Sequence, residues 1–173
     1  MGFKLNADGE SLTFTGIIHL AGNVTNPTEG PDGIKIIIQC CNDIGAYGAG
    51  VSGAISGKWP KVAKEYYKWS ENLKTFKLGA VQFIPVEDKI IVANMIGQHR
   101  VGTGSNGTPP IRYEAIAECL DKVVEKAIEQ NATIHAPRFG AGLAGGDWDK
   151  ISELIEKHVV SKGKSVYIYD YIE

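Results

Sequence analysis

Hydrophobic residues recur along the chain with two different periods. Residues 34–41 are almost continuously apolar, which is typical of a strand buried on both faces of a parallel sheet. Residues 111–130 instead repeat apolar side chains at intervals of three and four, the spacing of an amphipathic helix. The same patterns predict further strands at 11–20, 81–84, 89–96, 133–139 and 165–171, and further helices at 51–56, 60–69 and 147–160.

Segments rich in glycine and proline separate these elements and are expected to be loops, at 23–33, 42–50, 97–110 and 140–146. The strand at 11–20 is expected to form a hairpin with a segment that begins at Phe3. Because strands and helices alternate, we expect an α/β fold, a three-layer α/β/α sandwich around a mixed, mainly parallel central sheet. The length of 173 residues fits one domain, 1–173.

Composition narrows the classes of partner. A formal net charge of −2 gives no basic footprint, so we expect no nucleic-acid partner. No apolar run approaches the ~20 residues of a membrane helix, and residues 1–10 lack a signal-peptide pattern. The three cysteines, Cys40, Cys41 and Cys119, have no metal-ligand spacing and are expected to be reduced. These features predict a cytoplasmic protein with no membrane partner, metal or cofactor, and we expect a monomer.

Two G-x-G-x-x-G patterns each follow a predicted strand and precede a predicted helix. Their members are Gly48, Gly50 and Gly53 in the first loop and Gly140, Gly142 and Gly145 in the second. Glycine lets an anion approach the backbone, whose N–H groups and helix dipole then hold it. Ligands in open α/β sheets bind beyond the carboxyl ends of the strands. The paired loops therefore favour a phosphate or diphosphate site, although such glycines also serve simply as tight turns.

Two other phosphate-binding classes fit the sequence poorly. A dinucleotide-binding fingerprint requires an acidic residue at the end of the next strand, ~20 residues later. That distance from Gly53 falls near Leu73 in a helical stretch, and from Gly145 it falls near Ser165, close to the end of the chain. Neither loop leads into the Gly-Lys-Ser or Gly-Lys-Thr of a P-loop.

Three segments resemble motifs of the macrodomain family. Gly22-Asn23-Val24-Thr25 resembles its adenine-side motif, with Asn23 in place of the usual Asp. Cys41-Asn42-Asp43 followed by Gly48-Ala49-Gly50-Val51 resembles its ribose and phosphate loop, and residues 137–148 resemble its second phosphate loop. Residues 93–96 and 110–115 are similar to segments of phage and bacterial members that process ADP-ribose 1″-phosphate. The resemblance spans about residues 12–171.

The resemblance implies a protein that binds ADP-ribose or ADP-ribose 1″-phosphate and hydrolyses the latter to ADP-ribose and phosphate. Alternatives are an ADP-ribosyl-acidic-residue hydrolase, an O-acyl-ADP-ribose deacylase and a non-enzymatic ADP-ribose-binding module. The ligand contacts it implies are Gly22, Asn23, Val24, Asp43, Tyr47, Gly48, Ala49, Gly50, Val51, Arg138, Phe139, Gly140, Ala141, Gly142, Leu143, Ala144 and Gly145.

Three residues are candidates for catalysis, each with a structural alternative. Asp147 could activate water, or it could cap the helix that follows it. Asn42 could hold the distal ribose, or it could initiate the turn after the buried strand. His99 could act as an acid or base, or it could be a solvated loop residue. The amide oxygen of Asn23 could accept the hydrogen bond from adenine that the usual Asp accepts.

Overall fold

The computed structural model describes residues 2–5, 12–47, 50–142 and 144–170. Six strands form one sheet in the order β3-β8-β7-β4-β6-β5. Every neighbouring pair is parallel except β5–β6, which is antiparallel. The strands are β3 Ile17–Ala21, β4 Lys35–Asn42, β5 Val81–Glu87, β6 Ile90–Gln98, β7 Thr133–Ala136 and β8 Val166–Asp170. The expected mixed, mainly parallel sheet is confirmed.

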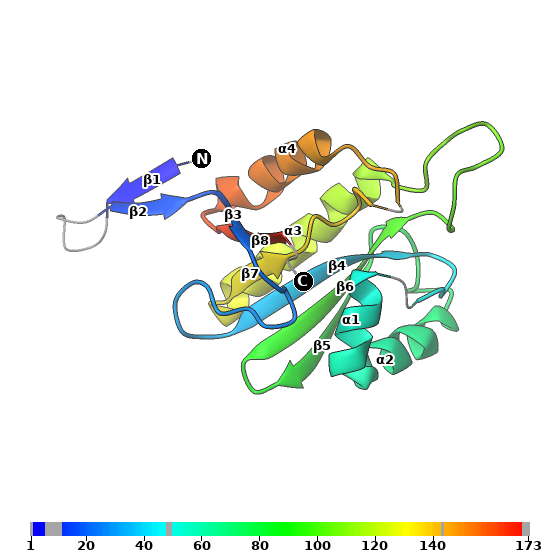
Figure 1. Cartoon of the computed structure of the whole chain (residues 1–173), viewed down its shortest axis with the longest axis horizontal. Helices are drawn as coiled ribbons and strands as arrows, with labels where there is room; N and C mark the ends of the chain where they lie inside the picture. Colours follow the sequence, from blue (N-terminus) through cyan, green and yellow to red (C-terminus); the bar gives the residue numbers. More distant parts are fainter. Residues whose placement is uncertain (1, 6–11, 48–49, 143, 171–173) are drawn as a thin grey trace.

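Four helices cover the two faces of this sheet (Figure 1). Helices α1 Val51–Lys58 and α2 Pro60–Ser70 pack on one face, and helices α3 Tyr113–Gln130 and α4 Trp148–His158 pack on the other. A short 3₁₀ turn, Val160–Lys162, follows α4. The three-layer α/β/α sandwich predicted from the sequence is therefore confirmed.

Strand β4 lies in the interior of the sheet because it is apolar on both faces. Ile36 and Ile38 are fully buried against the α3 and α4 side, and Ile37 is fully buried against the α1 and α2 side. The buried apolar side chains of α3 form much of the hydrophobic core on the side of the sheet that α3 and α4 cover. Pro60 occupies the first turn of α2, as expected, where its missing N–H costs no hydrogen bond.

Several boundaries differ from those expected. The strand predicted at 11–20 is divided at Gly16 into β2 Leu12–Thr15 and β3. Strand β2 pairs antiparallel with β1 Gly2–Leu5, which confirms the hairpin. Helix α3 begins two residues later than predicted, because Ile111 forms an antiparallel bridge with Gln98 and Arg112 is extended.

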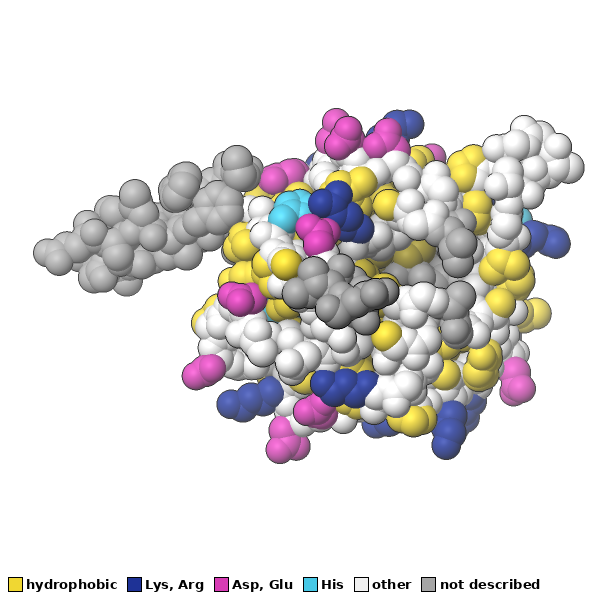
Figure 2. Space-filling view, in the orientation of Figure 1, with side chains coloured by type: hydrophobic (Ala, Val, Ile, Leu, Met, Phe, Trp, Pro, Cys, Tyr) yellow, Lys and Arg dark blue, Asp and Glu magenta, His cyan; other side chains and the backbone are white. Residues whose placement is uncertain are grey.

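The topology brings both glycine loops to one edge of the sheet. Strands β4 and β7 are parallel neighbours, and the segments that follow them lead into α1 and toward α4 (Figure 1). On the face seen in Figure 2, acidic and basic side chains are interspersed and neither sign forms a continuous patch. Within the described ranges, no helix combines the length and apolar character needed to cross a membrane.

Candidate ligand-binding cleft

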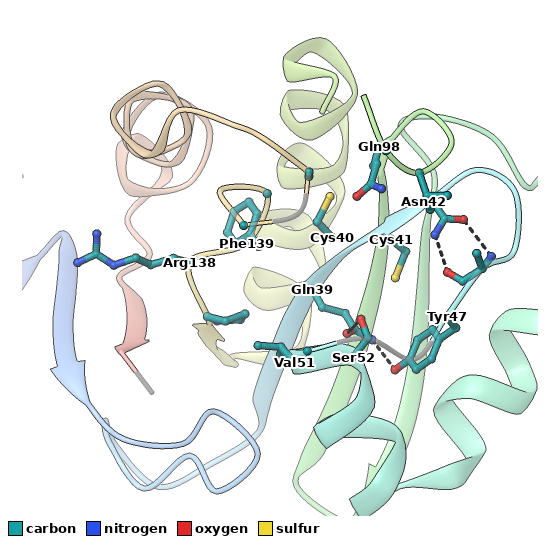
Figure 3. A pocket seen from close by; sticks show the side chains of 18 residues that line it. Gln39, Cys40, Cys41, Asn42, Tyr47, Val51, Ser52, Gln98, Arg138 and Phe139 are labelled. Carbon is teal, nitrogen blue, oxygen red and sulfur yellow. Dashed lines mark hydrogen bonds between the residues drawn. The ribbon is translucent and has the colours of Figure 1, made fainter. Parts of the chain in front are cut away.

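A cleft of about 600 Å³ lies where the segments after β4, β6 and β7 meet (Figure 3). The predicted site residues that line it are Asn42, Tyr47, Gly50, Val51, Arg138, Phe139, Gly140, Gly142 and Ala144. Of the other predicted residues that the structure describes, Gly22, Asn23, Val24, Asp43, His99, Ala141, Gly145 and Asp147 are not part of this lining. Gly48, Ala49 and Leu143 lie outside the described residues.

The second loop uses its glycines in two ways. Gly140 and Gly145 have positive φ angles of 76° and 73°. An added Cβ on Gly140 would lie 2.6 Å from Ile111 Cδ1, and one on Gly145 would lie 2.9 Å from Pro109 Cβ. Gly142 lacks a positive φ, and an added Cβ there would enter open space. The fold therefore requires glycine at positions 140 and 145, although Gly140 also lines the cleft, whereas Gly142 leaves its surface free for a ligand.

The first loop ends at the amino terminus of α1. Gly50 has a φ of 58° and no atom within 4 Å of an added Cβ. It supplies no side chain to cap α1, and Val51 and Ser52 of the first turn line the cleft. The N–H groups of a first helical turn have no partner inside the helix, and they carry the positive end of its dipole. This end of the cleft is suited to an anion.

Asn42 holds the turn between β4 and the first loop. Its side-chain oxygen accepts hydrogen bonds from Ile44 N at 3.1 Å, Ala46 N at 3.0 Å and the Tyr66 hydroxyl at 3.0 Å. Its amide nitrogen donates to the Ala46 carbonyl. Asn42 is buried and lines the cleft, so the turn-initiating alternative is confirmed, while contact with a ribose stays a prediction.

His99 and Asp43 form a pair beside the cleft. His99 Nδ1 lies 2.7 Å from Asp43 Oδ2, and Arg100 N donates to Asp43 Oδ1 at 2.8 Å. The His99 side chain is 44% exposed, and its chain neighbours Gln98, Val101 and Gly102 line the cleft. A carboxylate on Nδ1 fixes the orientation of an imidazole and leaves Nε2 free for proton transfer.

Asp147 caps helix α4. Its Oδ1 accepts from Asp149 N at 2.9 Å, and its own N–H donates to the Tyr113 hydroxyl at 2.9 Å. The structural alternative for Asp147 is confirmed. Because the residue is exposed and outside the described lining of the cleft, its expected catalytic role has no structural support.

The segment Gly22-Asn23-Val24-Thr25 follows β3 and turns back on itself. Asn23 Oδ1 accepts from Thr25 N at 2.9 Å and from the Thr25 hydroxyl at 2.7 Å. Val24 is buried in the core beneath α1. The amide oxygen expected to meet adenine is therefore already engaged within the turn.

Comparison with known proteins decides the family. The family model described as Macro domain matches residues 38–155. The chain belongs to the macrodomain family. Among curated proteins it is 30% identical to mouse "Chromodomain-helicase-DNA-binding protein 1-like" over 92% of the chain. The chain spans only 18% of that protein's length. It is also 24% identical to "ADP-ribose 1''-phosphate phosphatase" of Candida glabrata, over 77% of the chain and 89% of that protein.

Solved structures include close neighbours of this macrodomain. A Bacteroides thetaiotaomicron protein of unknown function is 41% identical, with a TM-score of 0.87 over 92% of this chain and all of the other. A Streptomyces coelicolor macrodomain protein is 40% identical, with a TM-score of 0.76 over 89% of this chain and 98% of the other. Thermosipho africanus DarTG in complex with ADP-ribose shares the fold, at 14% identity and a TM-score of 0.64 over 80% of this chain and 38% of the other.

The macrodomain cleft carries little charge of its own. Burial raises the pKa of the Cys40 thiol to about 12 and also raises that of the Cys41 thiol well above its usual range, so neither is a thiolate at neutral pH. Arg138 is the charged side chain of the described lining. It donates from Nε to Asp170 Oδ1 at 2.7 Å, and this hydrogen bond lowers the pKa of the Asp170 carboxyl. The charge of Arg138 is therefore balanced by Asp170, and the described lining with this partner carries no net side-chain charge, so the attraction for an anion comes from the amino terminus of α1.

Further residues of the lining are not among those that the sequence predicted. They are Gln39, Cys40, Cys41, Ala46, Ser52, Gln98, Val101, Gly102 and Pro137. Gln39 had a usable signal, because it is a buried polar residue in the middle of the apolar run of β4. Gln98, Val101 and Gly102 had none, since their loop reaches the cleft only through the pairing of β6 with β4. Within the described part of the chain, no three His, Cys, Asp or Glu residues gather as a metal ion requires.

Proposed function

We propose that this macrodomain binds ADP-ribose in the cleft between the two glycine loops. The observation that carries the proposal is a property that Gly50 and Gly142 share. Both line the cleft, and both leave open space where a side chain would stand. The first turn of α1, to which Gly50 gives no side-chain cap, lies at the same place and can hold an anion. The ADP-ribose complex of Thermosipho africanus DarTG, a protein of the same fold, supports this ligand class.

Calorimetry tests the ligand class. ADP-ribose should bind, whereas AMP and NAD should bind more weakly, because AMP lacks the diphosphate and NAD carries a base on the distal ribose. No heat of binding with ADP-ribose at millimolar concentration would overturn the proposal. Equal affinity for NAD would favour a dinucleotide-binding protein instead.

A second candidate is hydrolysis of ADP-ribose 1″-phosphate. Water would attack phosphorus, the bond between phosphorus and the ribose oxygen would break, and phosphate and ADP-ribose would leave. The observation that favours it is the His99–Asp43 pair beside the cleft, in which Asp43 orients the imidazole so that Nε2 could accept the water proton. The similarity to the Candida glabrata phosphatase adds support.

Phosphate release separates this enzyme from a binding module. His99→Ala should retain ADP-ribose binding and slow phosphate release by ~10²–10⁴-fold, the usual contribution of a general base. Asp147→Ala provides the matched comparison, because its structural role is the cap of α4. Absence of phosphate release from the unsubstituted protein would leave the binding function alone and remove the proposed role of His99.

A further inference from the structure

Three carboxamide side chains cross the sheet beneath the cleft. Gln39 of β4 is the register partner of Asn94 of β6, and Asn94 is the register partner of Gln82 of β5. Gln39 is 2% exposed and Asn94 is fully buried. Burial of polar groups is costly unless their hydrogen bonds are satisfied. Each of these buried amides is therefore expected to form hydrogen bonds with its neighbours in the fold.

A backbone carbonyl at one end fixes the direction of every hydrogen bond in this row of amides. Gln82 Nε2 donates to the Glu65 carbonyl of α2 at 3.0 Å, and a carbonyl can only accept. Gln82 Oε1 must then accept from Asn94 Nδ2, at 3.1 Å. Asn94 Oδ1 in turn accepts from Gln39 Nε2 at 2.7 Å.

The same direction reaches the cleft through Gln39. Its Oε1 faces Ser52 in the first turn of α1, and the Ser52 hydroxyl donates to it at 3.0 Å. Its Nε2 has a second hydrogen, which it donates to the Tyr47 hydroxyl oxygen at 2.9 Å (Figure 3). The hydroxyl hydrogen of Ser52 is therefore donated to Gln39, whereas the hydroxyl of Tyr47 accepts from Gln39 and its own hydrogen remains available for donation.

The position of Tyr47 allows its hydroxyl hydrogen to be donated to a ligand in the cleft. It lines the cleft, and its hydroxyl shares Gln39 with Ser52 of the first turn of α1. Burial raises the pKa of the Tyr47 phenol, so it remains protonated and able to donate at neutral pH. A phosphate group bound by the N–H groups at the amino terminus of α1 would offer an oxygen that can accept the hydrogen of the Tyr47 hydroxyl.

We propose that the Tyr47 hydroxyl donates a hydrogen bond to a phosphate oxygen of the ligand, and that Gln39 is the positioning residue that keeps this hydrogen turned toward the cleft. The proposal rests on the proposed binding of ADP-ribose. It assigns the donor to Tyr47 rather than to Ser52. It also explains why a buried strand carries a glutamine in the floor of the cleft.

Calorimetry with ADP-ribose and with ADP tests the donor. Tyr47→Phe removes only the hydroxyl and should weaken binding of both ligands by ~10-fold or more, the usual value of a hydrogen bond to a charged group. Tyr167→Phe is the matched control, because Tyr167 lies on β8 outside the described lining of the cleft. It should leave both affinities unchanged.

Gln39→Glu tests the positioning role with almost no change of shape. A buried glutamic acid is neutral and has one hydrogen instead of two. Asn94 Oδ1 takes this hydrogen, so none remains for Tyr47, whose own hydrogen then turns to Glu. ADP-ribose affinity should fall to the level of Tyr47→Phe. The double variant should bind no more weakly than Tyr47→Phe alone, whereas a merely structural role of Gln39 would weaken binding further.

The outcomes separate this proposal from the proposed function. Loss of affinity in Tyr47→Phe for both ligands, with Tyr167→Phe unchanged, supports the proposal. Unchanged affinity in a folded Tyr47→Phe overturns it while ADP-ribose binding stands. A loss confined to ADP-ribose also overturns it, because the acceptor would then be the distal ribose. Failure of the unsubstituted protein to bind ADP-ribose overturns both.

Discussion

Gly140 and Gly142 stand two residues apart in the second loop, yet an added Cβ would meet opposite surroundings. At Gly140 the added Cβ would crowd Ile111 of the core, and the residue would have to keep a left-handed φ of 76°. At Gly142 it would stand in open space within the cleft lining. A substitution at Gly142 therefore tests ligand binding with little effect on folding, whereas one at Gly140 tests the packing of the loop against the core.

Gly142→Val is expected to weaken ADP-ribose binding at least ~10-fold with a melting temperature close to that of the unsubstituted protein, because a branched side chain occupies space meant for the ligand. Gly140→Ala is expected to lower the free energy of unfolding by about 1–3 kcal/mol through crowding of Ile111. Calorimetry and thermal unfolding of both variants check this. Full affinity in a folded Gly142→Val would contradict the assignment of the second loop.

His135 offers a test of the core. It is fully buried on β7, with Nδ1 2.7 Å from the Tyr169 hydroxyl, and burial lowers the pKa of its imidazole to about 3. An unfolded histidine binds its proton near pH 6.5. Below that pH the unfolded chain holds one proton more than the folded chain. The stabilisation from neutral His135 is therefore complete above pH 6.5 and is lost as the pH falls toward 3.

His135→Gln should accordingly be less stable than the unsubstituted protein at pH 7.5, and the difference should shrink as the pH falls to 4.5. The slope should approach about 1.4 kcal/mol per pH unit. Urea denaturation across this pH range measures it. A difference that does not change with pH would contradict the burial of a neutral His135.

Residue-level chemistry was predictable from the sequence where its partners are near in the chain. The cap at Asp147 and the turn at Asn42 involve partners two to four residues away. The pairing of His99 with Asp43 joins residues 56 apart, and that of Arg138 with Asp170 joins residues 32 apart. Such pairs depend on which strands lie side by side, which the local pattern does not contain.

Helices and strands agree with the prediction where the hydrophobic repeat continues over many residues and where a proline or glycine marks the boundary. Helix α2 begins at Pro60, and the 3₁₀ turn after α4 ends at Gly163, which has a φ of 91°. The break at Gly16 was missed, because the apolar alternation continues through β2 and β3 although the two strands pair with different partners. Pairing, rather than propensity, decides such a boundary.

Helix α4 allows the structural role of Asp147 to be measured. Asp147→Ala should lower the free energy of unfolding by ~1 kcal/mol, the usual value of a lost N-cap, and leave ADP-ribose affinity unchanged. Glu153→Ala, at an exposed mid-helix position, is the control and should change stability by less than about 0.5 kcal/mol. Normal stability of Asp147→Ala together with much slower phosphate release would restore a catalytic role.

At the scale of the whole molecule, the alternation of strands and helices was sufficient to predict three layers and a mainly parallel sheet. The order β3-β8-β7-β4-β6-β5 was not predictable, because strands distant in the chain become neighbours. This order places the segments after β4 and β7 together and brings the loop after β6 to the same cleft. The composition of the site follows from it, including the unforeseen Gln98, Val101 and Gly102.

An NMR titration of the ¹⁵N-labelled protein with ADP-ribose shows where on the molecule the ligand binds. The largest amide shifts should occur at Gly50, Val51, Phe139 and Gly142, which line the cleft. Amides beside the separate notch lined by Trp69 and Lys122 should remain nearly unchanged. No shifts at millimolar ADP-ribose, or shifts centred on that notch, would contradict binding of ADP-ribose in the cleft.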